Sequence, residues 1–473
     1  MSKDPGRVRR CGILAAGCLA AWPFAAPAQE DEATILAYAA GYKAAFICSA
    51  TFNGGKSLEQ IAAHELSGVD PRYADYFAEL SAALIDPAAK RVSVAYANDL
   101  PPRIAQWRRH LGCAQLPVGA PAEAAGLLPR IEIDTSGLEM AADNGRPWKD
   151  RVPVGGPSGN KALDEIVAKA FAKPNYGRDQ VTSAILIATP EGILAERYIE
   201  GFTPLTSQRT WSVAKSIAVS VIGVAVQKGM IDIAAPTGLR AWQRPLDPRR
   251  RITILNLLHM ASGLDSDARG NQTPRLYFGG GLVSDTATRG ALEAPPGSRW
   301  KYANNDTLLA MRALKEAIGQ RHAYLRFPFE ELLYKIGMTH TKIETDWDGN
   351  FVLSSQVWTT ARDLRRLGLL YLNDGVWQGQ RILPEGWAAF VATPAPAQPA
   401  APRPGYGAQW WLLNQRFPGL PNDAYAAMGN RGQYLLIMPS ENLLIVRRGY
   451  DPSGGQRFQL HIFARDVLEA LKR

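Results

Sequence analysis

Ser212 and Lys215 stand three residues apart at the start of an apolar stretch that ends at Gly229. The stretch has no proline and is apolar on nearly every side, which predicts a buried helix starting at Ser212. Residues i and i+3 share one face of a helix, so the amine of Lys215 would lie near the hydroxyl of Ser212. A serine becomes a nucleophile when a base removes its proton, and the unpaired N–H groups of a helix N-terminus favour negative charge.

The spacing alone is a weak indication, because a capping serine followed by a solvated lysine gives the same pattern. Two further matches, Ser158–Lys161 and Ser298–Lys301, lie beside segments rich in proline and glycine. Only the match at Ser212 opens a helix apolar enough to be buried, where an unpaired lysine charge is costly.

Tyr302 is the candidate for a second proton-handling group. It follows a Pro-Pro-Gly turn and precedes a predicted helix. A phenol beside a lysine ammonium is expected to have a lowered pKa, so Tyr302 would shuttle a proton between Ser212 and a leaving group. The Tyr-x-Asn pattern recurs at Tyr96 and Tyr371, so the pattern carries little weight without its position in the chain.

Four segments follow one another along the chain: Trp211–Ser216, Leu257–Leu264, Pro296–Asn304 and Gly429–Gln433. Their order and spacing resemble those of the serine β-lactamase-like hydrolases, in particular the branch of class C β-lactamases, esterases and 6-aminohexanoate-dimer hydrolases. The likeness covers residues 160–473.

The resemblance implies that Ser212 is the nucleophile, Lys215 its proton acceptor and Tyr302 the second acid/base group. Which of Lys215 and Tyr302 takes the first proton stays open. The resemblance also implies that Asn304 contacts substrate. His259, in the second segment, is expected to be packed rather than catalytic.

The third motif of the family, usually Lys-Thr-Gly or His-x-Gly on a strand, maps onto Asn430-Arg431-Gly432. Gly432 would let substrate lie close to that strand, and the N–H groups of Ser212 and Gln433 would form the oxyanion hole. Neutral Asn430 departs from the usual Lys or His, which binds an anionic substrate group. This departure puts recognition of β-lactam and peptidoglycan carboxylates in doubt more than ester or amide hydrolysis.

Composition and the remaining motifs disfavour other classes of protein. The six histidines form no His-x-His or His-Glu-x-x-His pair, so no metal or other cofactor is expected. No Gly-x-Ser-x-Gly elbow is present. The net charge of +9 is mild for 473 residues, and no Lys/Arg run is interleaved with aromatic residues, which gives nucleic-acid binding little support. The expected partner is a small ester, amide or lactam substrate.

Residues 1–28 are predicted to be a signal peptide. They contain a basic start, an alanine-rich apolar stretch over 11–25 and a small-x-small site at Ala26-Pro27-Ala28. A lipoprotein signal ending before Cys18 is the alternative. No other apolar run of membrane-spanning length is evident, so the protein is expected to be periplasmic or secreted, without a stable membrane span.

Residues 29–116 are expected to form a small N-terminal accessory unit, with helices over 33–46 and 58–66 and a strand over 91–96. Cys48 and Cys113 are expected to form a disulfide, and two buried free thiols are the alternative. Residues 117–159, rich in Pro, Gly and Ala, are interpreted as a linker.

The main domain is expected over 160–473. Strand patterns near its start (182–199) and near its end (406–413, 434–438 and 443–448) enclose predicted helices. This order predicts an α+β fold, with one antiparallel sheet flanked by helices and an inserted helical subdomain. The resemblance implies the serine β-lactamase/DD-peptidase-like fold.

The predicted function is that of an exported serine hydrolase, which cleaves ester or amide bonds through an acyl-enzyme on Ser212. The alternative is a ligand-binding or sensor module on the same fold, which acylates slowly or not at all.

Overall fold

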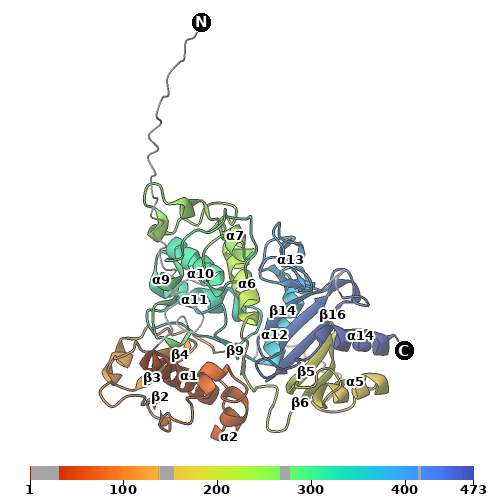
Figure 1. Cartoon of the computed structure of the whole chain (residues 1–473). Coiled ribbons are helices and arrows are strands. Elements are labelled where there is room, and N and C mark those ends of the chain that lie inside the picture. The colour runs from red at the N-terminus through yellow and green to blue at the C-terminus, as the bar shows by residue number, and fades with distance from the viewer. Residues whose placement is uncertain (2–30, 137, 139–153, 267–276, 414–416, 473) are drawn as a thin grey trace.

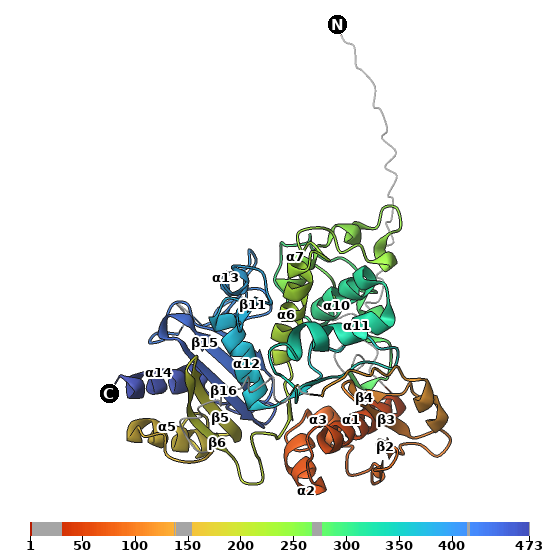
Figure 2. The ribbon, with the colours of Figure 1, turned by 180° about the vertical axis from the view of Figure 1, so that it is seen from behind.

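The structure is a computed structural model that describes residues 1, 31–136, 138, 154–266, 277–413 and 417–472. Three parts are visible in Figure 1: a large sheet with its helices (yellow and blue), a helical region (green) and an N-terminal unit (red to orange). The same parts are seen from behind in Figure 2.

A seven-stranded antiparallel sheet forms the frame of the main domain. Its strands, in spatial order, are β12 (Gly405–Tyr406), β13 (Trp411–Leu412), β14 (Tyr425–Gly429), β15 (Gln433–Met438), β16 (Leu443–Gly449), β5 (Thr182–Thr189) and β6 (Gly192–Tyr198). The first hairpin of the domain thus pairs with its last strand, as the yellow and blue strands show in Figure 1. The prediction of one antiparallel sheet built from both ends of the domain is confirmed.

Successive residues of β5 point to opposite faces of the sheet, as the two-residue period of a strand requires. Ile185 and Ile187 pack under α5 (Lys161–Phe171) and α14 (Leu460–Leu471), while Leu186 packs on the other face in the core that contains α6 and α12. Both faces are therefore covered by helices, which confirms the α+β fold class.

The helical region is inserted between β6 and β12. Its helices are α6 (Val213–Gln227), η3 (Arg240–Trp242), η4 (Pro248–Arg251), α7 (Ile254–Leu258), α9 (Val283–Ala287), α10 (Asn304–Ile318), α11 (Arg321–Pro328) and η5 (Phe329–Leu333). The same insertion also contains α12 (Ala361–Leu372) and α13 (Trp387–Ala392), which are blue in Figure 1 and lie on the side of the large sheet. Short strands complete it: β7 (Gln208–Arg209), β8 (Lys342–Ile343), β9 (Val357–Thr359), β10 (Val376–Trp377) and β11 (Gln380–Arg381). Every residue of α6 from Val213 to Ala225 is buried, because this helix lies between the sheet and the other helices.

The N-terminal unit packs a long helix on a four-stranded antiparallel sheet. Its elements are α1 (Glu32–Phe52), α2 (Leu58–Gln60), η1 (Ile61–Glu65), α3 (Pro71–Ala74), β1 (Leu84–Asp86), β2 (Arg91–Val94), β3 (Arg103–Arg108), β4 (Gly112–Gln115) and η2 (Ala122–Leu127).

Several bounds in the N-terminal unit differ from the sequence prediction. Helix α1 continues six residues beyond 46, through the cysteine that the disulfide holds. The expected helix over 58–66 starts with a capping box at Ser57 but widens into a π-helical turn after Gln60. Strand β2 ends at Val94, two residues earlier than predicted.

Helix α1 is long and apolar enough to cross a bilayer, and it is the one such helix in the described part of the chain. The expectation of no apolar run of membrane-spanning length outside the predicted signal peptide is therefore corrected. The apolar window of α1 is 67% buried inside the protein, where the helix covers the four-stranded sheet.

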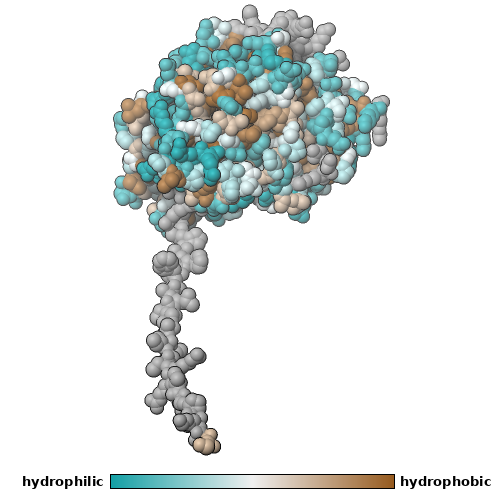
Figure 3. Space-filling view, turned by 90° about the horizontal axis from the view of Figure 1, so that it is seen from above, coloured by the Kyte–Doolittle hydropathy of each residue, from teal (hydrophilic) through white to brown (hydrophobic). Residues whose placement is uncertain are grey.

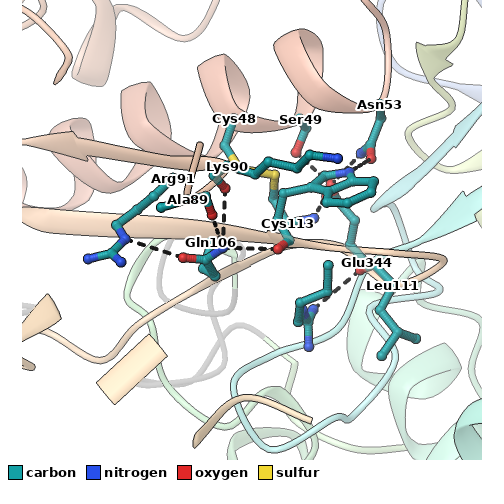
Figure 4. The surroundings of a disulfide bond; sticks show 12 residues. Cys48, Ser49, Asn53, Ala89, Lys90, Arg91, Gln106, Leu111, Cys113 and Glu344 are labelled. Atoms are coloured by element: carbon teal, nitrogen blue, oxygen red, sulfur yellow. Dashed lines mark hydrogen bonds between the residues drawn. A yellow bond between two sulfur atoms is a disulfide. The ribbon is translucent and has the colours of Figure 1, made fainter. Parts of the chain in front are cut away.

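The Cys48–Cys113 disulfide is confirmed, and it joins α1 to β4 (Figure 4). Beside it, the Oε1 atom of Glu344 accepts hydrogen bonds from Ser49 Oγ at 2.5 Å, Asn53 Nδ2 at 2.9 Å and the N–H of Cys113 at 3.1 Å. Burial raises the pKa of Glu344 to about 7. This carboxyl group of the main domain is thus enclosed by donors from the N-terminal unit.

Two predictions fall partly or wholly on undescribed residues. The signal peptide at 1–28 lies outside the described residues, apart from Met1. Of the predicted linker over 117–159, the first twenty residues are described and include η2, which packs Ala125 and Leu128 against β3 and β4. The domain boundaries stay predictions.

The face seen from above carries apolar patches separated by polar residues (Figure 3). Such a mixture is typical of folded proteins, whose accessible surface is more than half apolar.

We predict that replacing both Cys48 and Cys113 with alanine lowers the free energy of unfolding by about 2–4 kcal/mol. The cross-link joins residues separated by 65 positions, so its loss frees a long loop in the unfolded chain. Urea denaturation followed by tryptophan fluorescence measures the effect. Reductant should destabilise the wild type but not the variant. Equal stability of the wild type and the variant in the absence of reductant would contradict the prediction.

Candidate active site

Ser212 lies directly before α6, at the junction between that helix and β7. The preceding residue, Trp211, has a left-handed backbone with φ of 49°, which is uncommon for a bulky residue. Its ring packs against the Arg209 guanidinium, whose carbon lies 4.0 Å from the ring centroid. This sharp turn brings the chain from β7 into α6, with the half-buried Ser212 at the helix start.

Lys215 lies one helical turn after Ser212, and its side chain is 1% exposed. The amine donates hydrogen bonds to Ser212 Oγ at 3.2 Å, to Asn304 Oδ1 at 2.7 Å and to the carbonyl oxygen of Ser354 at 2.8 Å. Among the described residues it forms no ion pair, and burial lowers its pKa to about 7. The amine is therefore partly neutral at neutral pH.

Tyr302 reaches the same point from the segment before α10. Its ring centroid lies 4.9 Å from Lys215 Nζ, and its phenol shares a side-chain hydrogen bond with Ser212. The expected lowering of its pKa is wrong: burial raises the pKa, and the bond to Ser212 offsets only part of the rise. The rings of Tyr406 and Trp411, whose centroids lie 6.1 and 5.3 Å from that of Tyr302, help to exclude water from it.

Asn304 is the first residue of α10, and its side-chain oxygen accepts the shortest hydrogen bond of the lysine amine. It thus holds Lys215 from the start of α10. Its predicted contact with substrate stays a prediction. Ser354, which provides the other fixed acceptor, lies in a turn before β9 and belongs to no motif that the sequence analysis could identify.

The segment Asn430-Arg431-Gly432 was expected to lie on a strand. It lies instead in the turn between β14 and β15. Gly432 has φ of 76°, and a Cβ atom there would lie 1.8 Å from Arg447 Nη1. The turn and Arg447 therefore explain this glycine without a substrate. The side chain of Gln433 bonds to Arg448 inside the sheet, where Oε1 accepts from Nε at 2.7 Å.

Gly429, the last residue of β14, is the glycine that lies against Ser212. A Cβ atom at this position would lie 2.3 Å from the carbonyl oxygen of Thr210 and 3.2 Å from the backbone nitrogen of Ser212. Within the described residues, the N–H groups of Ser212 and Asn430 donate to no backbone carbonyl. Two N–H groups without a backbone acceptor in the part of the chain that the structure describes thus lie at or next to the contact at Gly429.

The remaining expectations concern His259 and metal binding. His259 packs its ring 6.1 Å from that of Phe390, and burial lowers its pKa to about 4. Among the described residues, no group of three or more His, Cys, Asp or Glu side chains could hold a metal ion.

A serine, a buried lysine and a tyrosine thus meet between an antiparallel sheet and a helical region, the arrangement that the resemblance to serine β-lactamase-like hydrolases predicts. The Beta-lactamase family model matches residues 167–448, and the chain belongs to that family. It is an enzyme family of serine hydrolases.

Similar proteins include enzymes with different substrates. The 6-aminohexanoate-dimer hydrolase of Paenarthrobacter ureafaciens is 26% identical over 307 residues, which are 60% of this chain and 76% of that protein. A family VIII carboxylesterase has a TM-score of 0.54 at 15% identity, over 68% of this chain and 98% of its own. A penicillin-binding protein homologue from Caulobacter crescentus has a TM-score of 0.52 at 14% identity, over 67% and 97%. These two structures support the fold alone.

We predict that Gly429→Ala lowers the rate of ester hydrolysis about 10²-fold, the usual cost of losing one oxyanion donor. The added methyl group must push β14 away from Ser212, because the Thr210 oxygen occupies its place. Initial rates with a p-nitrophenyl ester measure the effect. Gly281→Ala is the matched control, since its added Cβ meets nothing within 4 Å. Equal rates for the two variants would disprove the close approach at Gly429.

Proposed function

We propose that this protein is an exported serine hydrolase that cleaves ester or amide bonds through an acyl-enzyme on Ser212. The observation that carries the proposal is the buried amine of Lys215, 3.2 Å from Ser212 Oγ, with its pKa lowered to about 7. A general base is most effective when its pKa lies near the working pH.

The two pKa shifts support Lys215, rather than Tyr302, as the first proton acceptor. Burial favours the neutral amine of Lys215, which has a free electron pair. Burial also favours the neutral phenol of Tyr302, which carries a proton to give. The pair thus starts as one base and one acid, the division of roles that acyl transfer requires.

The proposed reaction follows from this division. The Ser212 hydroxyl transfers its proton to Lys215 Nζ while its oxygen attacks the substrate carbonyl carbon, which gives a tetrahedral oxyanion. As the oxyanion collapses, the bond to the leaving group breaks, and that group takes the phenol proton of Tyr302. The ammonium of Lys215 reprotonates the phenolate. Water then attacks the acyl-enzyme, and its proton passes through the same groups back to Ser212.

The N–H groups of Ser212 and Asn430 are the proposed oxyanion donors, in place of Ser212 and Gln433. Gly429 supports this assignment, because its contact with the Ser212 nitrogen brings the start of the β14–β15 turn beside the nucleophile. Asn430 then acts through its backbone, and its neutral side chain and that of Asn304 stay proposed substrate contacts. Gly432 shapes the turn.

Neutral Asn430, where the family usually has Lys or His, supports neutral ester or amide substrates. Its side chain, in the turn directly after Gly429, carries no charge that would attract a substrate carboxylate. The curated relative is named for hydrolysing the 6-aminohexanoate dimer, and one structural neighbour is named a carboxylesterase. Both names agree with hydrolysis of acyclic amides or esters.

Export is part of the proposal. Residues 1–28 have the pattern of a signal peptide, and the first described helix starts shortly after them, at Glu32. The Cys48–Cys113 disulfide supports an oxidising compartment, such as the periplasm or the exterior.

We predict that Ser212→Ala, Lys215→Ala and Tyr302→Phe each reduce kcat/KM for p-nitrophenyl esters by about 10³-fold or more. The three groups act as one unit, so double variants should be little worse than single ones. Mass spectrometry after incubation with esters and linear amides should detect the acyl adduct on Ser212. Near-normal rates in Lys215→Ala would exclude the mechanism.

Ser220→Ala is the matched control for Ser212→Ala. Ser220 is a buried serine of the same helix, and its hydroxyl bonds to the Ser216 carbonyl and Tyr371 rather than to Lys215. It should keep wild-type turnover. A wild type without turnover, indistinguishable from Ser212→Ala, would favour the ligand-binding or sensor module instead.

We predict that kcat/KM falls on the acid side with an apparent pKa of about 7, as Lys215 takes up a proton. The protonated amine cannot accept the proton of Ser212, so the rate should drop about tenfold per pH unit below that point. Activity should persist to alkaline pH, because the raised pKa of Tyr302 keeps the phenol protonated. An acid limb near pH 4–5, typical of a carboxylate base, would contradict this assignment.

A further inference from the structure

The lysine amine depends on a backbone carbonyl whose segment has no regular structure. The Ser354 carbonyl accepts from Lys215 Nζ at 2.8 Å, yet Ser354 lies in a turn before β9. A carbonyl in a turn can point at the amine only if other groups fix the turn. Ser354 is fully buried, and its hydroxyl lies 2.7 Å from the hydroxyl of Tyr277.

Tyr277 is a buried residue that the sequence analysis did not identify. Its side chain is 4% exposed, so it is enclosed in protein rather than presented to substrate. Besides the bond to Ser354, its phenol interacts with Ser355 and lies near enough to Tyr302 to raise the pKa of that phenol. Tyr277 thus contacts Ser354, which binds the lysine amine, and lies near Tyr302.

The N-terminal unit holds the backbone on which Tyr277 sits. Gln115 Nε2, at the end of β4, donates to the Tyr277 carbonyl at 2.7 Å. Arg103 Nη2, on β3, donates to the next carbonyl, that of Phe278, at 2.9 Å. The Phe278 ring also packs on Tyr42 of α1, with centroids 4.7 Å apart. In both ribbon views this unit lies against the helical region (Figures 1 and 2).

We propose that Tyr277 is a positioning residue, which fixes the Ser354 turn so that its carbonyl orients the amine of Lys215 toward Ser212. The N-terminal unit, through Gln115 and Arg103, holds Tyr277 in place and is thereby part of the catalytic apparatus. This inference rests on the proposed function, in which Lys215 is the base.

The titratable groups around the amine are few. Tyr302 faces Lys215 from the segment before α10, and Tyr277 faces Ser354 from the segment before α9. Arg209 of β7 is the charged group that acts on Tyr277. Since no carboxylate among the described residues pairs with the amine, its neutral acceptors decide its orientation and its affinity for a proton.

The test is Tyr277→Phe, which keeps the ring and removes the hydroxyl. We expect kcat to fall about tenfold with KM within about twofold, because the amine is misplaced but the binding surface is kept. The acid limb should move down by about half a pH unit, since a poorly held carbonyl stabilises the ammonium less. The pH dependence of the rate at which a fluorophosphonate labels Ser212 measures the same acid limb. This labelling needs no deacylation step.

Tyr371→Phe is the matched control. Tyr371 is also buried, and its hydroxyl lies 2.8 Å from the hydroxyl of Ser220 on α6, away from Lys215. It should lose similar stability while kcat and the acid limb stay unchanged. The proposal is overturned if Tyr277→Phe has the same kcat and the same acid limb as Tyr371→Phe. It is also overturned if the pKa of the acid limb rises in Tyr277→Phe.

Ser354→Ala completes a double-mutant cycle, because it removes the hydroxyl but keeps the carbonyl. If Tyr277 acts through Ser354, the double variant should match either single variant in kcat. If the losses in kcat of the two single variants multiply in the double variant, Tyr277 acts by a route other than Ser354, and the proposal is overturned. A wild type without Ser212-dependent turnover would instead refute the proposed function, so the two failures are distinguishable.

Discussion

The enclosure of one amine beside one hydroxyl is the constraint on which this site depends. Water would hold Lys215 as a charged ammonium, and a charged ammonium has no electron pair to accept the proton of Ser212. The side chain is 1% exposed, and its three hydrogen-bond acceptors are uncharged. Neutral acceptors orient the amine without the Coulomb attraction by which a carboxylate would keep it protonated.

The rest of the fold maintains that enclosure from several directions. Asn304 of α10 and the turn at Ser354 each supply an oxygen to the lysine amine, and Gly429 of the sheet lies against the Ser212 nitrogen. Segments from distant parts of the chain thus meet around Ser212 and Lys215. The left-handed backbone at Trp211 is part of this arrangement, because it turns the chain from the end of β7 to Ser212, where α6 begins, buried from Val213 to Ala225.

Features set by local spacing could be predicted from the sequence, and features set by distant neighbours could not. The i, i+3 relation of Ser212 and Lys215 follows from helix geometry, and the sheet from strand patterns at both ends of the domain. The sequence contains Gly429 and Gly432 three residues apart, and only the position of the turn decides which one meets Ser212. The pKa of Tyr302 rises among rings a hundred residues away in the chain, and Tyr277 belongs to no motif.

The docking of the N-terminal unit has a practical consequence for anyone who expresses this protein. A fragment trimmed to the family match would uncover the Phe278 ring and leave Glu344 without the three donors that now surround it. Freed from those donors and exposed to water, that carboxylate would ionise, and the bared aromatic surface would favour aggregation. The segment that the family model matches therefore depends on contacts with the N-terminal unit, and recombinant work should begin near the start of α1.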